Sequence, residues 1–444
     1  MRLRGLIAGA VVLAALAVGL YFSNKQKSAE AAKPPSSNDT SPKILSLTEG
    51  DITKIALKKK GADETDLEKN ASGKWALTAP QKYMADQDAV NQLAGSAASV
   101  NSDRVVEDKA TDVSGYGLKQ PNLEVDVTTK AGKTSKLLIG DDTPTNSGAY
   151  AQLEGDPRVF TIASYVKTGL DKSVNDLRDK RLLTFDQDKL SRVELLAKKQ
   201  DIEFGRDKDQ WQIVKPKPLR ADGLQVEELI RKLKDAKMDL TVSADDTKKA
   251  ATSFGSGTQV ATVKTTDPSG TQTLEVRKNK DDYFAKSSAV EGVFKVTSDL
   301  GTGLDKSVDD FRNKKLFDFG FSEPSKIDMH DGSKSYAFQK TGEDWLSNGK
   351  KLDNTSLQSL IDKLRDLSAA KFVDTGFGTP AIDVTVTSND GKRVEKVLIS
   401  KQGNDYIAKR ENEPSQYSLD AKTVDDLTKA ASDVKEAPPP AKKK

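Results

Sequence analysis

The sequence predicts an α+β protein: an N-terminal transmembrane helix followed by three tandem repeats, each an antiparallel sheet with a helix packed on it. Two long segments are nearly the same, residues 169–185 (GLDKSVNDLRDKRLLTF) and 303–319 (GLDKSVDDFRNKKLFDF), and they match at 11 of 17 positions. The three tryptophans, Trp75, Trp211 and Trp345, are separated by 136 and 134 residues. An uncharged run at residues 5–22 precedes both features. Self-similarity at a fixed period is the signature of repeated units.

Length and composition limit the classes of function. A chain of 444 residues holds about two to four domains. Its 70 Lys and Arg residues are interleaved with 67 Asp and Glu residues, so we expect no nucleic acid partner. There is no cysteine, which excludes disulfides and thiolate sites, and His330 is the single histidine. A multi-histidine zinc site is therefore excluded, and a histidine triad would depend on that residue alone.

The N-terminal run is expected to be an uncleaved membrane anchor at residues 1–24. Its 18 residues would rise roughly 27 Å as a helix, close to the thickness of a bilayer core. The alternative is a cleaved signal peptide, but its candidate site, residues 29–31 (AEA), lies far downstream. The short basic start (MRLR) places the large C-terminal part outside the cytoplasm, on a bacterial inner membrane. Residues 25–42 and 433–444 have the composition of a flexible linker and a disordered tail.

The predicted repeats are residues 43–182, 183–316 and 317–432. An aspartate that can cap a helix follows each tryptophan: Asp86, Asp222 and Asp353. Apolar residues follow each aspartate at +4, +7, +8 and +11, the stripe of an amphipathic helix. They are Val90, Leu93, Ala94 and Ala97; Val226, Leu229, Ile230 and Leu233; and Leu357, Leu360, Ile361 and Leu364.

Each repeat continues with an aromatic-glycine pair and then two β-rich runs around a turn. The pairs are Tyr116-Gly117, Phe254-Gly255 and Phe377-Gly378. The runs are residues 125–129 and 136–139, 262–266 and 273–276, and 383–387 and 395–399. Alternating apolar residues with a turn between them indicate antiparallel hairpins.

The duplicated segment is interpreted as a joint, because its first copy lies between repeats one and two and its second copy between repeats two and three. Leu177 and Phe311 are expected to pack across these boundaries, whereas Leu182 and Phe185 would seat the chain against the next repeat. The rival hypothesis is a docking site used twice. In that case the charges of Lys172, Arg178, Lys306 and Arg312 would matter more than the apolar side chains.

No catalytic, cofactor-binding or metal-binding residue is assigned. The aromatic-glycine pairs could clamp a ligand, but turns whose aromatic ring plugs the core are favoured. The tryptophans could stack on sugars, but three equivalent core positions are favoured. Three acidic stretches are interpreted as polar turns because they lack the spacing of a calcium loop: residues 140–144 (GDDTP), Asp207 with Asp209, and Asp281 with Asp282.

The order of several short motifs resembles a bacterial family, the domain-of-unknown-function family 4340, best over residues 47–183. The motifs here are residues 75–80 (WALTAP), 85–86 (AD), 116–121 (YGLKQP), 138–141 (LIGD) and 177–180 (LRDK). The second and third repeats depart from it: residues 254–257 (FGSG) lack the Leu and Pro of the motif, and Arg277 replaces the Gly-Asp pair. The resemblance implies a membrane-tethered extracytoplasmic protein, and some members are encoded beside ABC-type transporters of the gliding-motility auxiliary kind. It implies no catalytic residues.

Together these observations predict a membrane-anchored, non-enzymatic scaffold or adaptor outside the cytoplasm, with an accessory role to an ABC-type transporter as one form. Its expected contacts are membrane lipid through the N-terminal helix and a protein partner in the membrane or envelope, with no small-molecule substrate and no cofactor. The alternative is a carbohydrate- or cell-wall-binding module that uses exposed aromatic residues. A hydrolytic enzyme ranks last.

Overall fold

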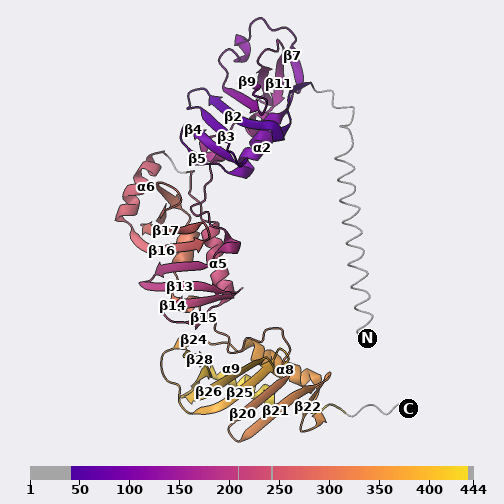
Figure 1. Ribbon diagram of the computed structural model, residues 1–444, viewed down its shortest axis with the longest axis vertical. Helices are drawn as coiled ribbons and strands as arrows, with labels where there is room; N and C mark the ends of the chain where they lie inside the picture. Colours follow the sequence, from indigo (N-terminus) through magenta and orange to yellow (C-terminus); the bar gives the residue numbers. More distant parts are fainter. Residues whose placement is uncertain (1–41, 209, 242–243, 439–444) are drawn as a thin grey trace, which may run out of the picture. The chain divides into compact units, whose positions relative to one another are not determined.

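The computed structural model describes residues 42–208, 210–241 and 244–438 (Figure 1). The predicted anchor at residues 1–24, the linker up to residue 41 and the end of the tail lie outside the described residues. Among the described residues, no helix is both long and apolar enough to cross a membrane. The chain divides into two compact units, Met1–Lys180 and Arg181–Lys444.

The first unit contains a nine-stranded antiparallel sheet in the order β5-β4-β3-β2-β8-β9-β10-β11-β7. A separate two-stranded pair joins β1 (Lys43–Ser46) and β6 (Ser99–Asn101). The sheet strands are β2 (Ile52–Lys59), β3 (Thr65–Lys69), β4 (Trp75–Ala79), β5 (Tyr83–Met84), β7 (Arg104–Glu107), β8 (Leu123–Thr129), β9 (Thr134–Asp142), β10 (Gly148–Leu153) and β11 (Val159–Ala163). Its helices are η1 (Glu49–Asp51), α2 (Gln87–Ala98), η2 (Ser114–Tyr116), α3 (Ser164–Leu170) and α4 (Val174–Leu177).

The second unit contains two sheets, here called the second and third sheets. The second has the order β15-β14-β13-β12-β16-β17-β18-β19. Its elements are η3 (Gln187–Lys189), β12 (Arg192–Ala197), β13 (Gln200–Asp207), β14 (Gln210–Lys215), β15 (Leu219–Arg220), α5 (Gly223–Lys234), α6 (Ala244–Ser256), β16 (Thr258–Asp267), β17 (Gly270–Asn279), β18 (Asp282–Ser287), β19 (Val293–Val296), α7 (Ser298–Leu304) and η4 (Val308–Asp310).

The third sheet has the order β23-β22-β21-β20-β25-β26-β27-β28-β24. Its elements are β20 (Lys326–Asp331), β21 (Lys334–Thr341), β22 (Asp344–Ser347), β23 (Lys350–Lys351), α8 (Asn354–Asp366), β24 (Lys371–Val373), β25 (Pro380–Ser388), β26 (Arg393–Gln402), β27 (Asp405–Arg410), β28 (Gln416–Leu419) and α9 (Ala421–Ser432). The predicted antiparallel hairpins are confirmed in all three sheets, as β8–β9, β16–β17 and β25–β26.

All three sheets follow one plan. Each contains two four-stranded meanders whose first strands pair antiparallel at the centre, namely β2 with β8, β12 with β16 and β20 with β25, and the first and third sheets add a ninth strand, β7 or β24. A helix follows the first meander (α2, α5 and α8) and another follows the second (α3, α7 and α9). Each sheet is therefore a pair of meander-plus-helix halves, a second level of duplication that the sequence analysis did not detect.

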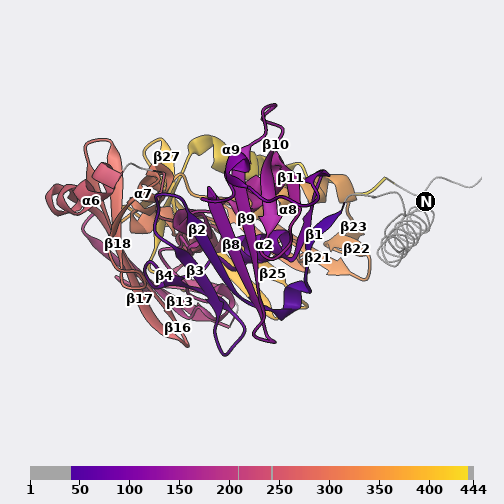
Figure 2. The same ribbon diagram turned by 90° about the horizontal axis from the view of Figure 1, so that it is seen from above.

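The predicted helices and their caps are confirmed. The Asp86 carboxylate accepts hydrogen bonds from two backbone N–H groups of the first turn of α2, and Asp222 does the same in α5. Asp353 accepts one from Ser356. Every residue of the predicted apolar stripes is buried. Helix α2 contacts β2, and Figure 2 shows the two in the same part of the first unit, as an apolar helix face packed on a sheet requires.

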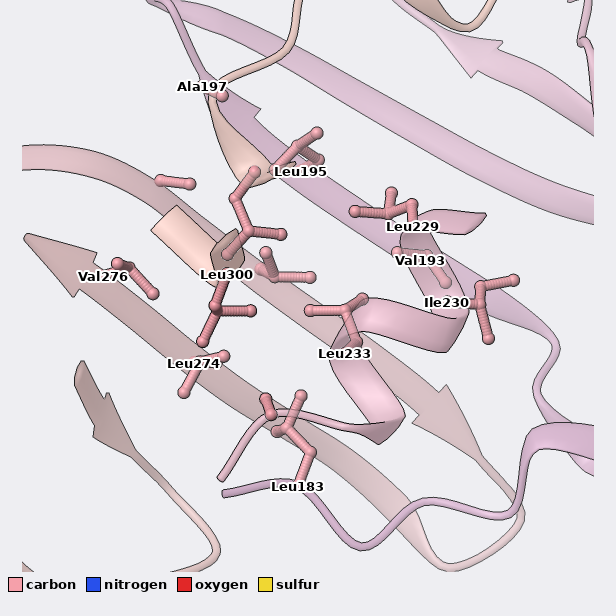
Figure 3. Packing of buried hydrophobic residues seen from close by; sticks show 14 of the residues in the cluster. Leu183, Val193, Leu195, Ala197, Leu229, Ile230, Leu233, Leu274, Val276 and Leu300 are labelled. Atoms are coloured by element: carbon pink, nitrogen blue, oxygen red, sulfur yellow. The ribbon is translucent and has the colours of Figure 1, made fainter. Parts of the chain in front are cut away.

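The core of each repeat lies between one face of its sheet and these helices. In the second sheet, Val193 and Leu195 from β12 and Leu274 and Val276 from β17 meet Leu233 of α5 (Figure 3). The three tryptophans are only 3–4% exposed and belong to the three cores, so their prediction as core residues is confirmed. Two of the indoles also donate to the neighbouring helix: Trp75 Nε1 to Asn91 Oδ1 at 3.0 Å and Trp211 Nε1 to Glu227 Oε1 at 2.7 Å.

The linking segments are divided between two cores, which corrects one expectation. Leu177 and Phe311 do not pack across the boundaries; each is buried in the core that precedes it. Their backbones explain this, because Asp86 N–H donates to Leu177 O at 2.8 Å and Asp222 N–H to Phe311 O at 2.7 Å. Leu182 and Phe185 do pack in the following core, as predicted. Leu182, assigned to repeat one, and Leu316, assigned to repeat two, thus belong to the next core.

The predicted tail begins with an ordered stretch. Asp353 N–H donates to Lys435 O at 2.8 Å, and Ala437 N–H donates to Lys351 O at 2.8 Å. Leu352 and Glu436 form a β-bridge, as Ala85 does with Arg178 and Ala221 with Arg312. Residues 435–437 therefore close the third sheet in the way that the two linking segments close the first and second sheets.

Candidate functional site

The Tyr116-Gly117 loop packs closely against the Gly140-Asp141 pair of the first sheet. Gly117 has φ +70°, and a Cβ on Gly140 would stand only 2.1 Å from the Tyr116 carbonyl oxygen. Asp141 Oδ1 accepts from Asn122 Nδ2 at 3.1 Å. The Tyr116 and Tyr150 rings lie 4.9 Å apart. The pair therefore lets two backbones approach closely, and because Gly140 and Asp141 lie in strand β9, their prediction as part of a polar turn is wrong.

In the other two sheets the aromatic-glycine pair has different contacts. In the third sheet Gly378 N–H donates to Ser400 Oγ at 3.1 Å. In the second sheet the Arg277 guanidinium lies 4.7 Å from the centre of the Phe254 ring. The expectation of a turn fails there: Phe254-Gly255 lies in helix α6, and of the three glycines only Gly117 has a positive φ. Phe254 is buried in a small cluster separate from the main core.

The acidic stretches are turns and strand ends, and the described residues contain no cluster of three or more metal-ligating side chains. Asp142 pairs with Lys167 at 2.6 Å, and Asp282 pairs with Lys295 at 2.9 Å. Asp207 is exposed at the end of β13, and Asp209 lies outside the described residues. The His330 side chain is 55% exposed, with Nδ1 3.1 Å from Asp383 Oδ1. These groups do not converge on one point.

The arginines of the linking segments are engaged within the fold. Arg178 is 7% exposed, and its guanidinium lies 4.0 Å from the centre of the Tyr83 ring. Arg312 lies 3.5 Å from the centre of the Phe372 ring and pairs with Asp309 at 2.9 Å. Both arginines therefore stabilise the structure, which weakens the rival hypothesis that these charges dock a partner.

A largely buried ionic cluster joins the second and third sheets within the second unit. Arg220, on the edge strand β15, donates to Asp318 and Glu413, with N–O distances of 2.5 and 2.9 Å. Its Nη2 also donates to Tyr417 Oη at 3.0 Å. Arg410 pairs with Asp318, Glu413 and Glu395, and Glu395 is only 4% exposed. We call these six residues, Arg220, Asp318, Glu395, Arg410, Glu413 and Tyr417, the Arg220 cluster.

The pKa shifts of the cluster follow from burial and charge. Burial alone would lower the pKa of Arg220, but Asp318, Tyr417 and Glu413 together raise it above its ordinary value. Burial raises the pKa of Tyr417 against the opposing effect of Arg220. Tyr417 therefore keeps its proton and donates it to Glu413 Oε2 at 3.0 Å. Each charged group of the Arg220 cluster has a partner within the cluster. We infer that the cluster holds the second and third sheets together.

The outer edge of the second sheet is the strongest candidate site. In the first and third sheets a further strand, β7 or β24, covers the last strand of the second meander. Among the described residues of the second sheet no such strand follows β19. In all three sheets the chain that follows the first helix reaches the last strand of the second meander in the same way. The backbone N–H groups of Asp103, Asp239 and Ala370 donate to the carbonyl oxygens of Thr161, Lys295 and Ser418, respectively. The second sheet then diverges from the other two.

The divergence has a local cause at Asp239. Its Oδ1 accepts from the Thr241 N–H at 2.9 Å and from the Thr241 hydroxyl at 2.6 Å. These bonds lower the pKa of Asp239 and fix a turn at the point where the other two sheets continue as a strand. Helix α6 follows, and Figure 1 shows it separated from α5 by strands β16 and β17. It packs Ala250 and Phe254 against Phe284.

This arrangement leaves a cavity of about 220 Å³ between β19 and α6. Its walls mix apolar side chains with two lysines and two aspartates: Leu240, Ala250, Phe284, Val293, Phe294, Lys249, Lys295, Asp239 and Asp282. Ser253 of α6 also lines it. Sequence reasoning missed this site, because the missing strand becomes visible only when three strand orders are compared. The one available signal was the apolar pattern of residues 250–254 (AATSF).

A family model described as a domain of unknown function (DUF4340) matches residues 75–212 and again residues 211–383. Each match runs from the tryptophan strand of one sheet into the next sheet, so it spans a linking segment. No curated protein and no solved structure matches the chain.

Proposed function

The chain belongs to the DUF4340 family, and we propose that it is a non-enzymatic scaffold or adaptor that is anchored in a bacterial inner membrane and binds a protein partner outside the cytoplasm. The observation that carries the proposal is repetition. The same order of eight strands is built three times along the chain, with a ninth strand in the first and third sheets. Units in series present long surfaces because each unit contacts only its neighbours.

The membrane location rests on the sequence. The uncharged run at residues 5–22 follows two arginines, and the linker after it has the composition of a tether. Such an anchor would hold the three repeats at the outer face of the bilayer. The resemblance to members encoded beside ABC-type transporters makes a transporter subunit the partner class that we propose.

The carbohydrate-binding alternative loses its first support, because the three tryptophans are buried. It would have to use exposed aromatic residues such as Tyr165, which is 78% exposed, or Phe321, which is 96% exposed. These two lie in different units, and each stands near the start of a helix or in a loop. A sugar platform would need several such rings together.

Crosslinking and capture of the full chain from native membranes tests the proposal. We expect a membrane protein such as a transporter subunit to be enriched, and a variant with residues 5–22 replaced by a cleavable signal sequence to lose it. Protease added to intact spheroplasts should digest the large C-terminal part. Capture of glycan that depends on Tyr165 and Phe321, with no protein partner, would contradict the proposal.

A further inference from the structure

We infer that Asn70, at the tip of the hairpin between β3 and β4, is an acceptor for an N-linked oligosaccharide. The inference goes beyond the proposed function, but it rests on the location outside the cytoplasm that the proposed function includes. The acceptor pattern is Asn-x-Ser or Asn-x-Thr with any residue but proline in the middle, and it predicts a surface loop of an exported protein. Residues 70–72 (NAS) match this pattern.

The tip of this hairpin is accessible to an enzyme. β3 ends at Lys69 and β4 begins at Trp75, and all five residues between them, 70–74, are exposed. A Cβ on Gly73 would meet no heavy atom within 4 Å apart from its chain neighbours. An attached oligosaccharide is bulky and needs such free space, so the site meets this requirement.

The hydrogen bonds of the turn hold the Asn70 side chain by its oxygen. Asn70 Oδ1 accepts from the Ser72 N–H at 3.0 Å, from the Ser72 hydroxyl at 2.7 Å and from the Lys74 N–H at 3.0 Å. Among the described residues, no hydrogen-bond partner lies at Asn70 Nδ2. A glycan replaces one hydrogen of Nδ2 and leaves Oδ1 in place, so the modified side chain keeps all three hydrogen bonds.

Two other stretches of the chain match the same pattern, and the structure distinguishes one of them from Asn70. Residues 38–40 (NDT) lie outside the described residues. Residues 354–356 (NTS) form the first turn of α8. There the Ser356 N–H donates to Asp353 Oδ1 at 2.9 Å and the Ser356 hydroxyl donates to Asp353 O at 3.0 Å. The helix cap therefore engages the hydroxyl that the acceptor pattern requires.

The pattern at this hairpin belongs to the first repeat alone. Its tip at residues 69–74 (KNASGK) has six residues, whereas the corresponding tips at residues 207–210 (DKDQ) and 341–344 (TGED) have four and contain no asparagine. Glu68, two residues before Asn70, is exposed, and neither of the other matches has an acidic residue at that position. A carboxylate beside the acceptor gives an enzyme a charge by which to select this site.

The transfer needs a glycosyl donor, and the class that we propose is an oligosaccharide linked to a polyprenyl diphosphate. Asn70 Nδ2 attacks the anomeric carbon of the first sugar, and a bond forms between these two atoms. The bond from that carbon to the diphosphate oxygen breaks, and the polyprenyl diphosphate leaves with the electron pair. The amide loses one proton to a base of the transferase.

Mass spectrometry of the full chain from native membranes tests the inference. We expect a tryptic peptide of residues 70–74 (NASGK) that carries an oligosaccharide. Asn70→Gln should remove the added mass completely, and Ser72→Ala should lower the occupancy at least tenfold. Ser72→Thr keeps the hydroxyl and should retain the glycan. Asn354→Gln is the matched control, because it removes another match to the pattern, and it should leave the glycan unchanged.

The outcomes separate the inference from the proposed function. An unmodified peptide 70–74 in every copy overturns the inference, and so does a glycan that persists in Asn70→Gln. If added protease digests the large C-terminal part in spheroplasts but that part carries no glycan, the inference fails alone. If Asn70 is glycosylated but no protein partner is captured from the membrane, the scaffold proposal fails alone.

Discussion

The two linking segments are nearly identical in sequence, yet their surroundings differ in charge. At the second, Asp318 N–H donates to Glu395 Oε1 at 3.0 Å; at the first, Thr184 N–H donates to Gln272 Oε1 at 2.8 Å. The backbone arrangement is thus repeated, whereas the accepting side chain is the carboxylate Glu395 at the second segment and the neutral amide Gln272 at the first. Corresponding residues are Met84 and Arg220, Thr184 and Asp318, Gln272 and Glu395, Ser287 and Arg410, Val290 and Glu413, and Phe294 and Tyr417.

The second and third sheets belong to one unit, and Arg220 reaches from one into the other. The position of Arg220 is held in the first unit by Met84, which is 49% exposed. The repeated segment thus sets where each core ends, while Arg220, which lies outside it, joins the second and third sheets.

The largest expected effect comes from the positions at which the two segments agree. Phe311→Ala should cost about 3–5 kcal/mol and Leu177→Ala about 2–5 kcal/mol, because both are buried and would leave cavities. Each should destabilise only the sheet that precedes it. Hydrogen exchange of the strand amides under increasing denaturant separates the sheets. Lys172→Ala and Lys306→Ala are the controls, and equal losses in the following sheets would restore packing across the boundary.

The next largest effect is expected at Arg220, which corresponds to Met84 in the first unit. Arg220→Met leaves the Asp318 and Glu413 carboxylates without their main partner and should cost about 3 kcal/mol. We expect the second unit to unfold in two separated transitions rather than one, as followed by calorimetry. Met84→Arg is the reciprocal change at an exposed site and should alter stability by less than about 0.5 kcal/mol.

A triple variant sharpens that test by copying the neutral arrangement. Arg220→Met, Asp318→Thr and Glu413→Val together should recover much of the loss, because a fully neutral set leaves no uncompensated charge. If Arg220→Met alone leaves the single transition intact, the Arg220 cluster is not what joins the two sheets.

The helix caps should give smaller, uniform effects. Asp86→Ala, Asp222→Ala and Asp353→Ala should each cost about 0.5–2 kcal/mol, because each frees backbone donors in the first turn of a helix. Asp420 precedes α9 without a side-chain hydrogen bond to it, so Asp420→Ala is the matched control with little effect. Chemical denaturation measures all four. A loss at Asp420 equal to the others would mean that capping is not the cause.

The smallest effect depends on pH. Hydrogen bonds from the Ser269 hydroxyl and from backbone N–H groups, including that of Asp186, lower the pKa of Asp267 below its ordinary value of 3.8. Its contribution is therefore present above that value and is lost as the pH falls through the lower folded value. The free energy of unfolding of the second sheet should decrease over this acidic range, by less than the loss expected on removing one helix cap. Asp267→Asn should reduce the pH dependence of the second sheet. The third sheet has Ser388 at the corresponding position and should lack this contribution.

Much of the fold follows from local patterns, and its confirmed parts share one physical origin. The positions +4, +7, +8 and +11 after each capping aspartate are buried because the helix period and the cap are both local properties. The hairpins follow for the same reason, since alternation and a turn residue fix them over about ten residues. The order of the meanders within a sheet depends on pairing between strands that are far apart in sequence, so no local pattern predicts it.

The candidate site shows this limit clearly. Phe294 lies 44 residues after Ala250 in the chain, and Asp239, Ala250 and Phe294 each look ordinary in their own segments. The Asp239 turn is a local feature, but the cavity beside β19 is not, because its walls come from segments that only the fold brings together. The pair Gly140-Asp141 was visible as a motif, while its role depends on a loop that ends at Gly117.

The sequence by itself determined the period, the helix faces, the helix caps, the hairpins and the burial of the tryptophans, because each of these depends on residues close together in the chain. Three features depend on tertiary structure: Leu177 and Phe311 belong to the preceding cores, Arg220 joins the second and third sheets, and a cavity lies between β19 and α6. The physical reason is the same in each case. Burial, ion pairing and the walls of a cavity depend on distances between residues that are far apart in sequence, and folding sets those distances.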